Sequence, residues 1–383
     1  MSTGPLEGLL VADFSRVLAA PYLTMLLGDL GADIVKVERP GTGDDTRGWG
    51  PPHHRGDATY NLSVNRNKRS VVLDLAEREG RSAARRLATR ADVLIENFRP
   101  GTMARLGLDE KSLRTRNPGL IYCSLSGFGT GPGAALPGYD LLVQAVGGLM
   151  SVTGLAPGQP TKTGVALVDV LCGLHAGIGV LAALRHRDRT GQGQLVEVDL
   201  LSTLLSSMVN QSAAHTLTGT VPGIMGNRHP SIAPYEVFPA ADRPMVLAVG
   251  TDRQFRSLVS VLGVPGLADD ARFATNTARV AHADELASLL STSLSARTAE
   301  EWYDLLTPHG VPCGPVNDLA DAFRLAERLE LSPQVRVDGR DLVANPIRLE
   351  ATPPTYRKAP PALGEHTEEV LHWLATEPKE GYR

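Results

Sequence analysis

The sequence predicts an α/β protein whose larger part is a Rossmann-like, doubly wound parallel sheet covered by helices. Two observations carry this prediction. Short apolar runs, such as residues 93–95, lack the alternation of apolar and polar residues that marks a half-exposed strand, which is typical of strands buried on both faces. Helical stretches separate these runs, and strands that alternate with helices form βαβ units.

The N-terminal segment shows the pattern clearly. Residues 9–12 are an apolar run and predict a strand. Pro21 favours the first turn of a helix over 21–30, and Gly31 stands where a C-cap glycine is expected. The further elements predicted for this part are strands at 34–38, 70–75, 92–96, 120–125 and 195–198, and helices at 77–91, after Asp169 and at 200–215.

The chain divides into a large domain over 1–219, a linker with a small α/β domain over 220–332, and a C-terminal strap over 333–383. Residues 220–234 are rich in Gly, Pro and polar side chains, as linkers are. The small domain is predicted from a strand at 245–249 and helices near 253–262, 283–294 and 299–307. The strap is rich in proline and has one closing helix, at 367–374, so it needs another surface to cover.

Composition restricts the partners. The 38 basic and 42 acidic residues give a net charge of −4, which argues against a nucleic-acid partner. Three widely spaced cysteines, Cys123, Cys172 and Cys313, favour a reducing compartment and no thiolate metal site. No run reaches the ~18 apolar residues of a membrane span, so we expect no membrane partner and a cytoplasmic protein.

Asp169 is the first candidate for chemistry. It stands where the apolar run 165–168, predicted to be a strand, meets a small-residue helical stretch over 171–177. A carboxylate at such a junction is held by rigid elements and faces the positive end of a helix. The alternative is that Asp169 is only the N-cap of the helix, which the local sequence favours.

An ordered series of motifs outweighs that local argument. Together they resemble the class III CoA-transferases of the CaiB/BaiF type, which include formyl-CoA:oxalate, carnitine and succinyl-CoA:dicarboxylate CoA-transferases. The resemblance covers essentially the whole chain. The matching segments are 26–40, 43–44, 67–70, 96–101, 126–129, 138–140, Arg279, 310–312 and 361–367.

The resemblance implies that Asp169 is the nucleophile. Its attack on an acyl-CoA gives an acyl-aspartyl anhydride, and the CoA thiolate then attacks the anhydride to form an aspartyl-CoA thioester. The acceptor acid runs the same two steps backward. Proximity and avoided solvent reorganisation would drive this chemistry. The resemblance also implies an interlocked homodimer, coenzyme A as a substrate, and neither a metal nor a tightly bound cofactor.

The residues that the resemblance assigns to CoA binding lie in five segments. In some members of the family a lysine stands where this chain has Pro137. The predicted CoA contacts are Val17, Leu18, Arg39, Leu73, Asp74, Leu75, Ala76, Asn97, Phe98, Arg99, Arg105, Leu136, Pro137, Gly138 and Tyr139.

Two other functions remain open. The α-methylacyl-CoA racemases and isomerases are similar in fold but carry Gly-His-Asp where this chain has Gly138-Tyr139-Asp140. Their histidine acts as a base, and a tyrosine is neutral at physiological pH, so this function is disfavoured. A non-catalytic acyl-CoA-binding protein would lack the carboxylate of Asp169. Residues 226–230 resemble the branch that uses succinate and glutarate, so Asp140, Arg228 and His229 are predicted to contact the acid substrate.

Overall fold

A computed structural model describes residues 4–376 and separates the chain into two compact units. The first unit contains the residues up to Leu149, Lys162–Val221, and the residues from Ser332 onward. The second contains Met150–Thr161 and Pro222–Leu331. The C-terminal segment therefore belongs with the first unit, and no feature of the sequence had indicated that 150–161 group with the second.

A six-stranded parallel sheet forms the centre of the first unit, as the apolar runs predicted. Its spatial order is β5-β2-β1-β6-β7-β8, so the first three strands run outward in one direction and the last three in the other. This is the doubly wound order. The strands are β1 (Leu10–Asp13), β2 (Asp33–Glu38), β5 (Lys68–Val72), β6 (Val93–Glu96), β7 (Ile121–Ser126) and β8 (Leu195–Asp199).

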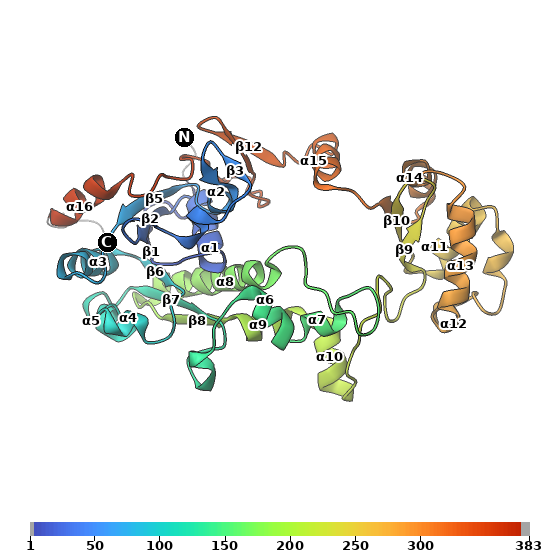
Figure 1. The fold of residues 1–383 in the computed structure, drawn as a ribbon, viewed down its shortest axis with the longest axis horizontal. Coiled ribbons are helices and arrows are strands. Elements are labelled where there is room, and N and C mark those ends of the chain that lie inside the picture. The colour runs from blue at the N-terminus through green and yellow to red at the C-terminus, as the bar shows by residue number, and fades with distance from the viewer. Residues whose placement is uncertain (1–3, 377–383) are drawn as a thin grey trace. The chain divides into compact units, whose positions relative to one another are not determined.

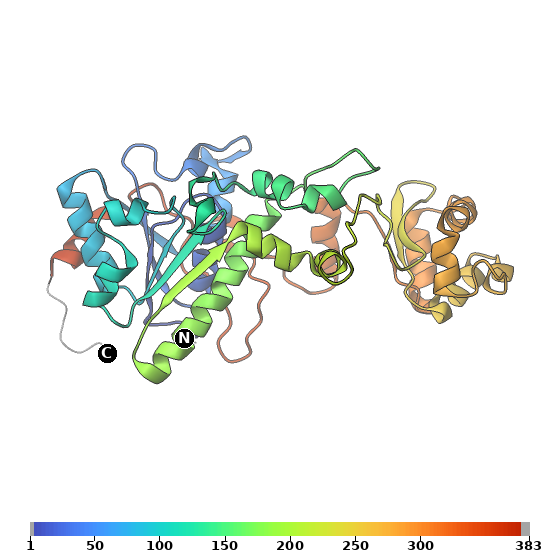
Figure 2. The ribbon, with the colours of Figure 1, turned by 90° about the horizontal axis from the view of Figure 1, so that it is seen from below.

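Helices cover both faces of this sheet and form two cores (Figures 1 and 2). Val11 packs into one core and Ala12 into the other, as successive residues of a strand must. Helices α1 (Ala19–Asp29) and α8 (Leu167–Thr190) cover the first face, and α3 (Arg78–Arg90), α5 (Glu110–Arg116) and α16 (Thr367–Ala375) the second. The remaining elements of this unit are β3 (His53–His54), β4 (Asp57–Ala58), α2 (Thr59–Ser63), α4 (Thr102–Arg105), α6 (Asp140–Val146), α9 (Leu200–Ser207), α10 (Val209–Thr218), β12 (Gln334–Val337) and β13 (Arg340–Val343).

Helix α8 corrects two sequence-based expectations. Residues 165–168 do not form a strand, because α8 already begins at Leu167 with Ala166 as its N-cap. Within residues 4–376, α8 is also long and apolar enough to cross a membrane by length and composition alone. Asp169 and His175 interrupt its apolar residues, yet the mean hydropathy of the helix stays high. Figure 2 shows α8 running along β8, and seven of its residues are buried in this fold.

The second unit contains a three-stranded antiparallel sheet of order β11-β10-β9 beside its own helices and core. Arg279, one of the family motifs, is fully buried there and donates hydrogen bonds to the carbonyls of Ala233 (2.7 Å) and Phe273 (2.9 Å). The elements are β9 (Tyr235–Pro239), β10 (Pro244–Ala248), α11 (Asp252–Val261), α12 (Asn276–Ala281), α13 (Ala283–Leu294), α14 (Ala299–Leu306), β11 (Cys313–Pro315) and α15 (Leu319–Arg328), while α7 (Leu149–Val152) lies where the first unit passes into the second.

The C-terminal strap is fixed to the first unit by the motif that begins at Asn67. The Asn67 side-chain oxygen accepts hydrogen bonds from the backbone N–H groups of Arg357 (2.7 Å) and Lys358 (3.1 Å). The guanidinium of Arg47 donates to the carbonyl of Pro361 at 3.2 Å. These polar contacts explain how a segment without a core of its own keeps a defined path.

Candidate active site

The doubly wound order places a crevice between β1 and β6, because the loops that follow these neighbouring strands lead away in opposite directions. A cavity of about 280 Å³ lies there, beside the ends of α1 and α8. It is lined by Arg16, Val17, Leu18, Ala19, Asp45, Asn97, Phe98, Arg99, Pro100, Leu125, Ser126, Gly127, Leu136, Pro137, Gly138, Tyr139, Asp169 and Leu200.

The loop after β1, residues 14–18, is held by hydrogen bonds along its length. The Phe14 N–H donates to the carbonyl of Ile95 at 2.8 Å. Asn97 binds the backbone of Arg16 twice, accepting from its N–H at 2.8 Å and donating to its carbonyl at 2.7 Å. Asn97, predicted as a CoA contact, is therefore also a clamp between the two loops of the crevice.

Val17 has a backbone conformation that is unusual for its residue type. Its φ angle is +69°, in the left-handed region, where a β-branched side chain is rarely found. Such a residue costs roughly 1–3 kcal/mol and persists only where the surrounding structure enforces it, which is common at functional sites. Its N–H donates to Oδ1 of Asp44 at 3.3 Å, and the residue lines the cavity.

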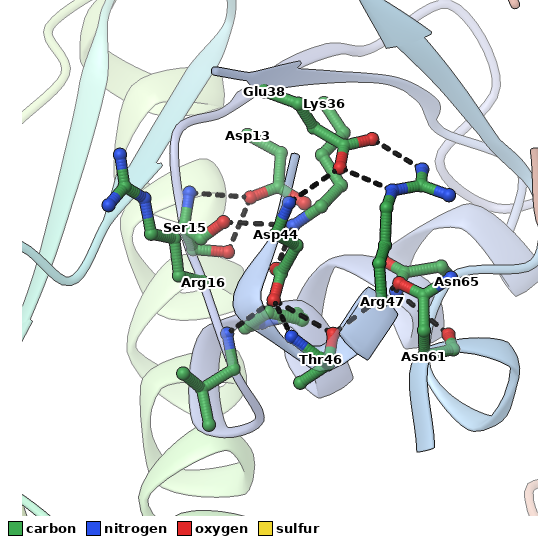
Figure 3. A network of polar contacts seen from close by, with 12 residues as sticks. Asp13, Ser15, Arg16, Lys36, Glu38, Asp44, Thr46, Arg47, Asn61 and Asn65 are labelled. Carbon is green, nitrogen blue, oxygen red and sulfur yellow. Dashed lines mark hydrogen bonds and ion pairs between the residues drawn. The ribbon is translucent and has the colours of Figure 1, made fainter. Parts of the chain in front are cut away.

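A buried ionic network supports this loop. Figure 3 shows Asp44 between Lys36 and Thr46, with Asp13 and Ser15 beside them. The Lys36 ammonium donates to Oδ2 of Asp44 and to the carbonyl of Ser15, both at 2.9 Å. Burial alone would raise the pKa of Asp44, but the charge and hydrogen bond of Lys36 and the hydrogen bonds of Thr46 outweigh it and lower the pKa to about 2.

Lys68 completes this network. Its ammonium is fully buried and donates to Oδ2 of Asp13 at 3.3 Å, and to Asn65 and the carbonyl of Pro21 at 2.9 Å each. Burial lowers the pKa of Lys68 to about 8, although Asp13 opposes this shift. Each buried charge in the network therefore has an opposite charge beside it, as buried charges require.

Asp169 is the third residue of α8 and faces the cavity. The interpretation of Asp169 as an N-cap is wrong, because Ala166 occupies that position. The capping oxygen comes from Asp140 instead, whose Oδ1 accepts the N–H groups of Val168 (2.8 Å) and Asp169 (3.2 Å). The predicted substrate contact Asp140 thus fixes the start of the helix that carries Asp169.

Within the described part of the chain, no charged or hydrogen-bonding side chain stabilises the carboxylate of Asp169. Among residues 4–376, no side chain donates a hydrogen bond to it, and burial together with the charge of Asp140 raises its pKa to about 7. Near neutral pH a large fraction is ionised while poorly solvated. A carboxylate in this state is more nucleophilic than one in water.

A second cavity of about 190 Å³ adjoins the first, and the two share Arg16 and Phe98. The Arg16 guanidinium lies 4.8 Å from the centre of the Phe98 ring, and burial, followed by the charge of Arg39, lowers its pKa. Two neighbouring guanidinium groups form a favourable place for an anion such as a phosphate. The predicted contacts Arg39, Leu73, Asp74, Leu75 and Ala76 line this second cavity.

Four predicted residues lie outside both cavities, and one of them is Asp140, which caps α8. Arg105 is exposed and donates to Thr102 at 3.1 Å. Arg228 and His229 belong to the second unit. There the guanidinium of Arg228 pairs with Glu236 (3.2 Å) and Asp284 (2.8 Å). His229 accepts the Ser231 N–H at 3.1 Å and packs against Tyr235.

The sequence did not indicate Arg16, Tyr60 or Trp49. Burial and the charges of Asp169 and Asp140 raise the pKa of Tyr60 to about 12, so its phenol stays protonated at neutral pH. Its ring meets that of Trp49 edge to face, with centroids 5.3 Å apart. Only the tertiary fold brings Tyr60 within range of the charge of Asp169, so no local pattern could reveal it.

Three comparisons with known proteins identify the family. The sequence profile described as CoA-transferase family III matches residues 6–367. A succinate–glutarate CoA-transferase of Agrobacterium fabrum is 43% identical over 97% of this chain and 96% of that protein. An acetyl-CoA:oxalate CoA-transferase of Acetobacter aceti is 41% identical over 94% of each chain. A CaiB/BaiF family protein of Brucella suis has a crystal structure with a TM-score of 0.89 and 40% identity, covering 97% of this chain and 100% of that chain. The resemblance that the motifs indicated is confirmed.

The raised pKa of Asp169 predicts a pH-dependent gain of stability on its removal. A pKa of about 7 exceeds the ~3.9 of an unfolded aspartate, so ionisation destabilises the folded state increasingly between about pH 4 and pH 7. Asp169→Asn should therefore raise the melting temperature at pH 8, and the gain should shrink toward pH 4. Thermal denaturation at both pH values measures this.

Asp109→Asn is the matched control for that experiment. Hydrogen bonds from Ser112 lower the pKa of Asp109, so its ionised form stabilises the fold and its removal should lower the melting temperature at pH 8. An Asp169→Asn shift of equal size at pH 4 and pH 8 would show that the Asp169 pKa is not raised.

Proposed function

The chain belongs to CoA-transferase family III, and from this premise we propose that it moves coenzyme A from an acyl-CoA donor to a free dicarboxylic acid, with Asp169 as nucleophile. The observation that carries the proposal is the carboxylate of Asp169 itself. It faces the cavity at the switch point of the sheet, has no donor or cation to stabilise it among the described residues, and has a pKa of about 7.

The two adjoining cavities suit a long ligand with distinct ends. Arg16 and Phe98 line both, so a bound CoA can pass from one cavity to the other along them. Arg16 and Arg39 are the candidates for its phosphates, and Leu73–Ala76 for its adenine. The wall over 136–139 would follow the pantetheine toward Asp169. CoA acts here as a substrate, with no tightly bound cofactor and no metal in the reaction.

The chemistry proceeds in four balanced steps. An Asp169 oxygen attacks the thioester carbonyl, and the carbon–sulfur bond breaks to give an acyl-aspartyl anhydride and CoA thiolate. The thiolate attacks the aspartyl carbonyl and releases the first acid as a carboxylate. The acceptor carboxylate then attacks the aspartyl-CoA thioester, and the freed thiolate attacks the new acyl carbonyl, which restores Asp169. Charge is carried throughout by carboxylates and a thiolate, so no histidine base is needed.

Dicarboxylic acids are the proposed acceptors. The relatives from Agrobacterium and Acetobacter are named for glutarate and oxalate, both of which carry two carboxylates. The second carboxylate needs a partner, because an unpaired buried charge is costly. Arg228 and His229 stay the predicted partners. Arg228 already pairs with Glu236 and Asp284, so a substrate carboxylate would have to compete with them.

Trapping of the covalent intermediate tests the function. The protein is incubated with succinyl-CoA, treated with hydroxylamine, digested and analysed by mass spectrometry. We expect a modified peptide at Asp169 in the wild type and none in Asp169→Ala, which should also lose transfer activity by several orders of magnitude because no neighbour replaces the nucleophile.

The control for that experiment is Asp199→Ala. Asp199 caps α9 through the Ser202 N–H at 2.7 Å and takes no part in either cavity. It should keep the adduct and most activity while losing some stability. Adduct formation in Asp169→Ala, or turnover near that of the wild type, would rule out the assignment of Asp169.

We also propose a homodimer in the cytoplasm, and the outer face of α8 supports the assembly. Leu174, Ile178 and Leu181 follow helical spacing and are 41%, 67% and 43% exposed. A contiguous apolar stripe on a helix of this length is typical of an interface.

The assembly predicts a solution mass of twice 40.8 kDa in light scattering, persisting at micromolar concentration. Ile178→Glu should shift the mass toward the monomer, because it introduces a charge into the apolar stripe. Leu289→Glu, at an exposed leucine on the helix α13, is the matched control and should leave the mass unchanged. A wild-type monomer at micromolar concentration would contradict the proposal.

A further inference from the structure

We propose that Asp44 is a positioning residue for the CoA cavity: by accepting the Val17 N–H, it holds Val17 in the left-handed conformation that shapes the cavity wall. The proposal rests on the proposed function for the identity of the ligand. Asp44 lines neither cavity and is 2% exposed, so it acts through Val17.

Val17 needs an external constraint to keep this conformation. Its φ of +69° is disfavoured for a β-branched side chain, and a glycine would adopt it freely. The neighbouring peptide groups have other anchors, since Asn97 binds both backbone groups of Arg16 and Lys36 binds the Ser15 carbonyl. The Val17 N–H is held by Asp44. Loss of this acceptor removes the restraint at the strained residue itself.

Asp44 is rigid enough to impose that constraint. Its Oδ1 accepts the backbone N–H of Thr46 at 3.0 Å and the Thr46 hydroxyl at 2.8 Å, and its Oδ2 accepts the buried ammonium of Lys36 at 2.9 Å (Figure 3). Lys36 also holds the Ser15 carbonyl. One ammonium on β2 therefore binds both the acceptor, Asp44, and the loop.

The conformation of Val17 decides the shape of the wall that faces the ligand. Arg16, which precedes it, lines both cavities, while Leu18, which follows it, caps α1 and lines the first. A change of φ at Val17 rotates the backbone that precedes this residue relative to the backbone that follows it. Arg16 would then move away from Leu18. CoA affinity should fall. Asp169 on α8, whose N–H is held by Asp140, should keep its place.

A double-substitution experiment tests the proposal. CoA affinity is measured by calorimetry for the wild type, Asp44→Ala, Val17→Gly and the combined variant. Asp44→Ala should raise the Kd about ten-fold or more, as expected when a hydrogen bond to a charged group is lost. The same change combined with Val17→Gly should raise the Kd only about two-fold relative to Val17→Gly alone, because glycine needs no restraint at this φ.

A merely structural role for Asp44 would not show this rescue. If Asp44→Ala weakens CoA binding by the same factor in both backgrounds, the proposal is overturned. Thr46→Val is the matched control, since it removes another hydrogen bond to the same Asp44 oxygen without touching Val17. It should lower the melting temperature but change the Kd less than Asp44→Ala does.

Amide hydrogen exchange provides a readout that needs no ligand. It is measured on a milder variant of Asp44. In Asp44→Ser, whose shorter side chain withdraws the acceptor from the Val17 N–H, the Val17 amide should exchange at least about ten-fold faster than in the wild type, while the Arg16 amide, held by Asn97, changes little. Unchanged exchange at Val17 would overturn the proposal even if Asp44→Ala failed to fold. Failure of the wild type to bind CoA would instead overturn the proposed function and leave the exchange result to decide the role of Asp44.

Discussion

The buried ammonium of Lys36 is the interaction on which the candidate site depends. Burial disfavours its charge, but Asp13, Asp44 and Glu38 surround it and raise its pKa, so it stays protonated. A buried charge is tolerated only where its partners are fixed, and this requirement joins β1 and β2 to the loops that follow them. The backbone of residues 14–18 is held by these partners and by Asn97, and residues 16–18 form part of the cavity wall.

The same residue type serves two purposes because its surroundings differ. Asp44 is buried, yet Lys36 and Thr46 lower its pKa to about 2, so it stays ionised and serves a structural role. Asp169 has burial and a like charge from Asp140 instead, and its pKa is about 7. Stabilised carboxylates hold the site, and the unstabilised one is left to react. Pairs of titratable groups driven apart in this way are typical of enzyme active sites.

The sequence predicted the parts of the fold that depend on local patterns. The apolar runs gave the parallel strands, and the motifs gave most of the residues that line the two cavities. Two features escaped prediction because they depend on partners distant in the chain. The capping of α8 by Asp140 spans 28 residues, and the support of Val17 by Asp44 spans 27. The strand expected before Asp169 was wrong for a related reason: apolar residues in a first helical turn resemble a short buried strand.

The most direct test of the account is a crystal structure of the Asp169→Ala variant with an acyl-CoA bound. The thioester carbonyl should lie beside residue 169, the pantetheine should follow residues 136–139, and the phosphates should contact Arg16 or Arg39. Val17 should keep its positive φ with its N–H on Asp44. An acyl-CoA bound with its thioester away from residue 169, or at a site outside both cavities, would contradict the account.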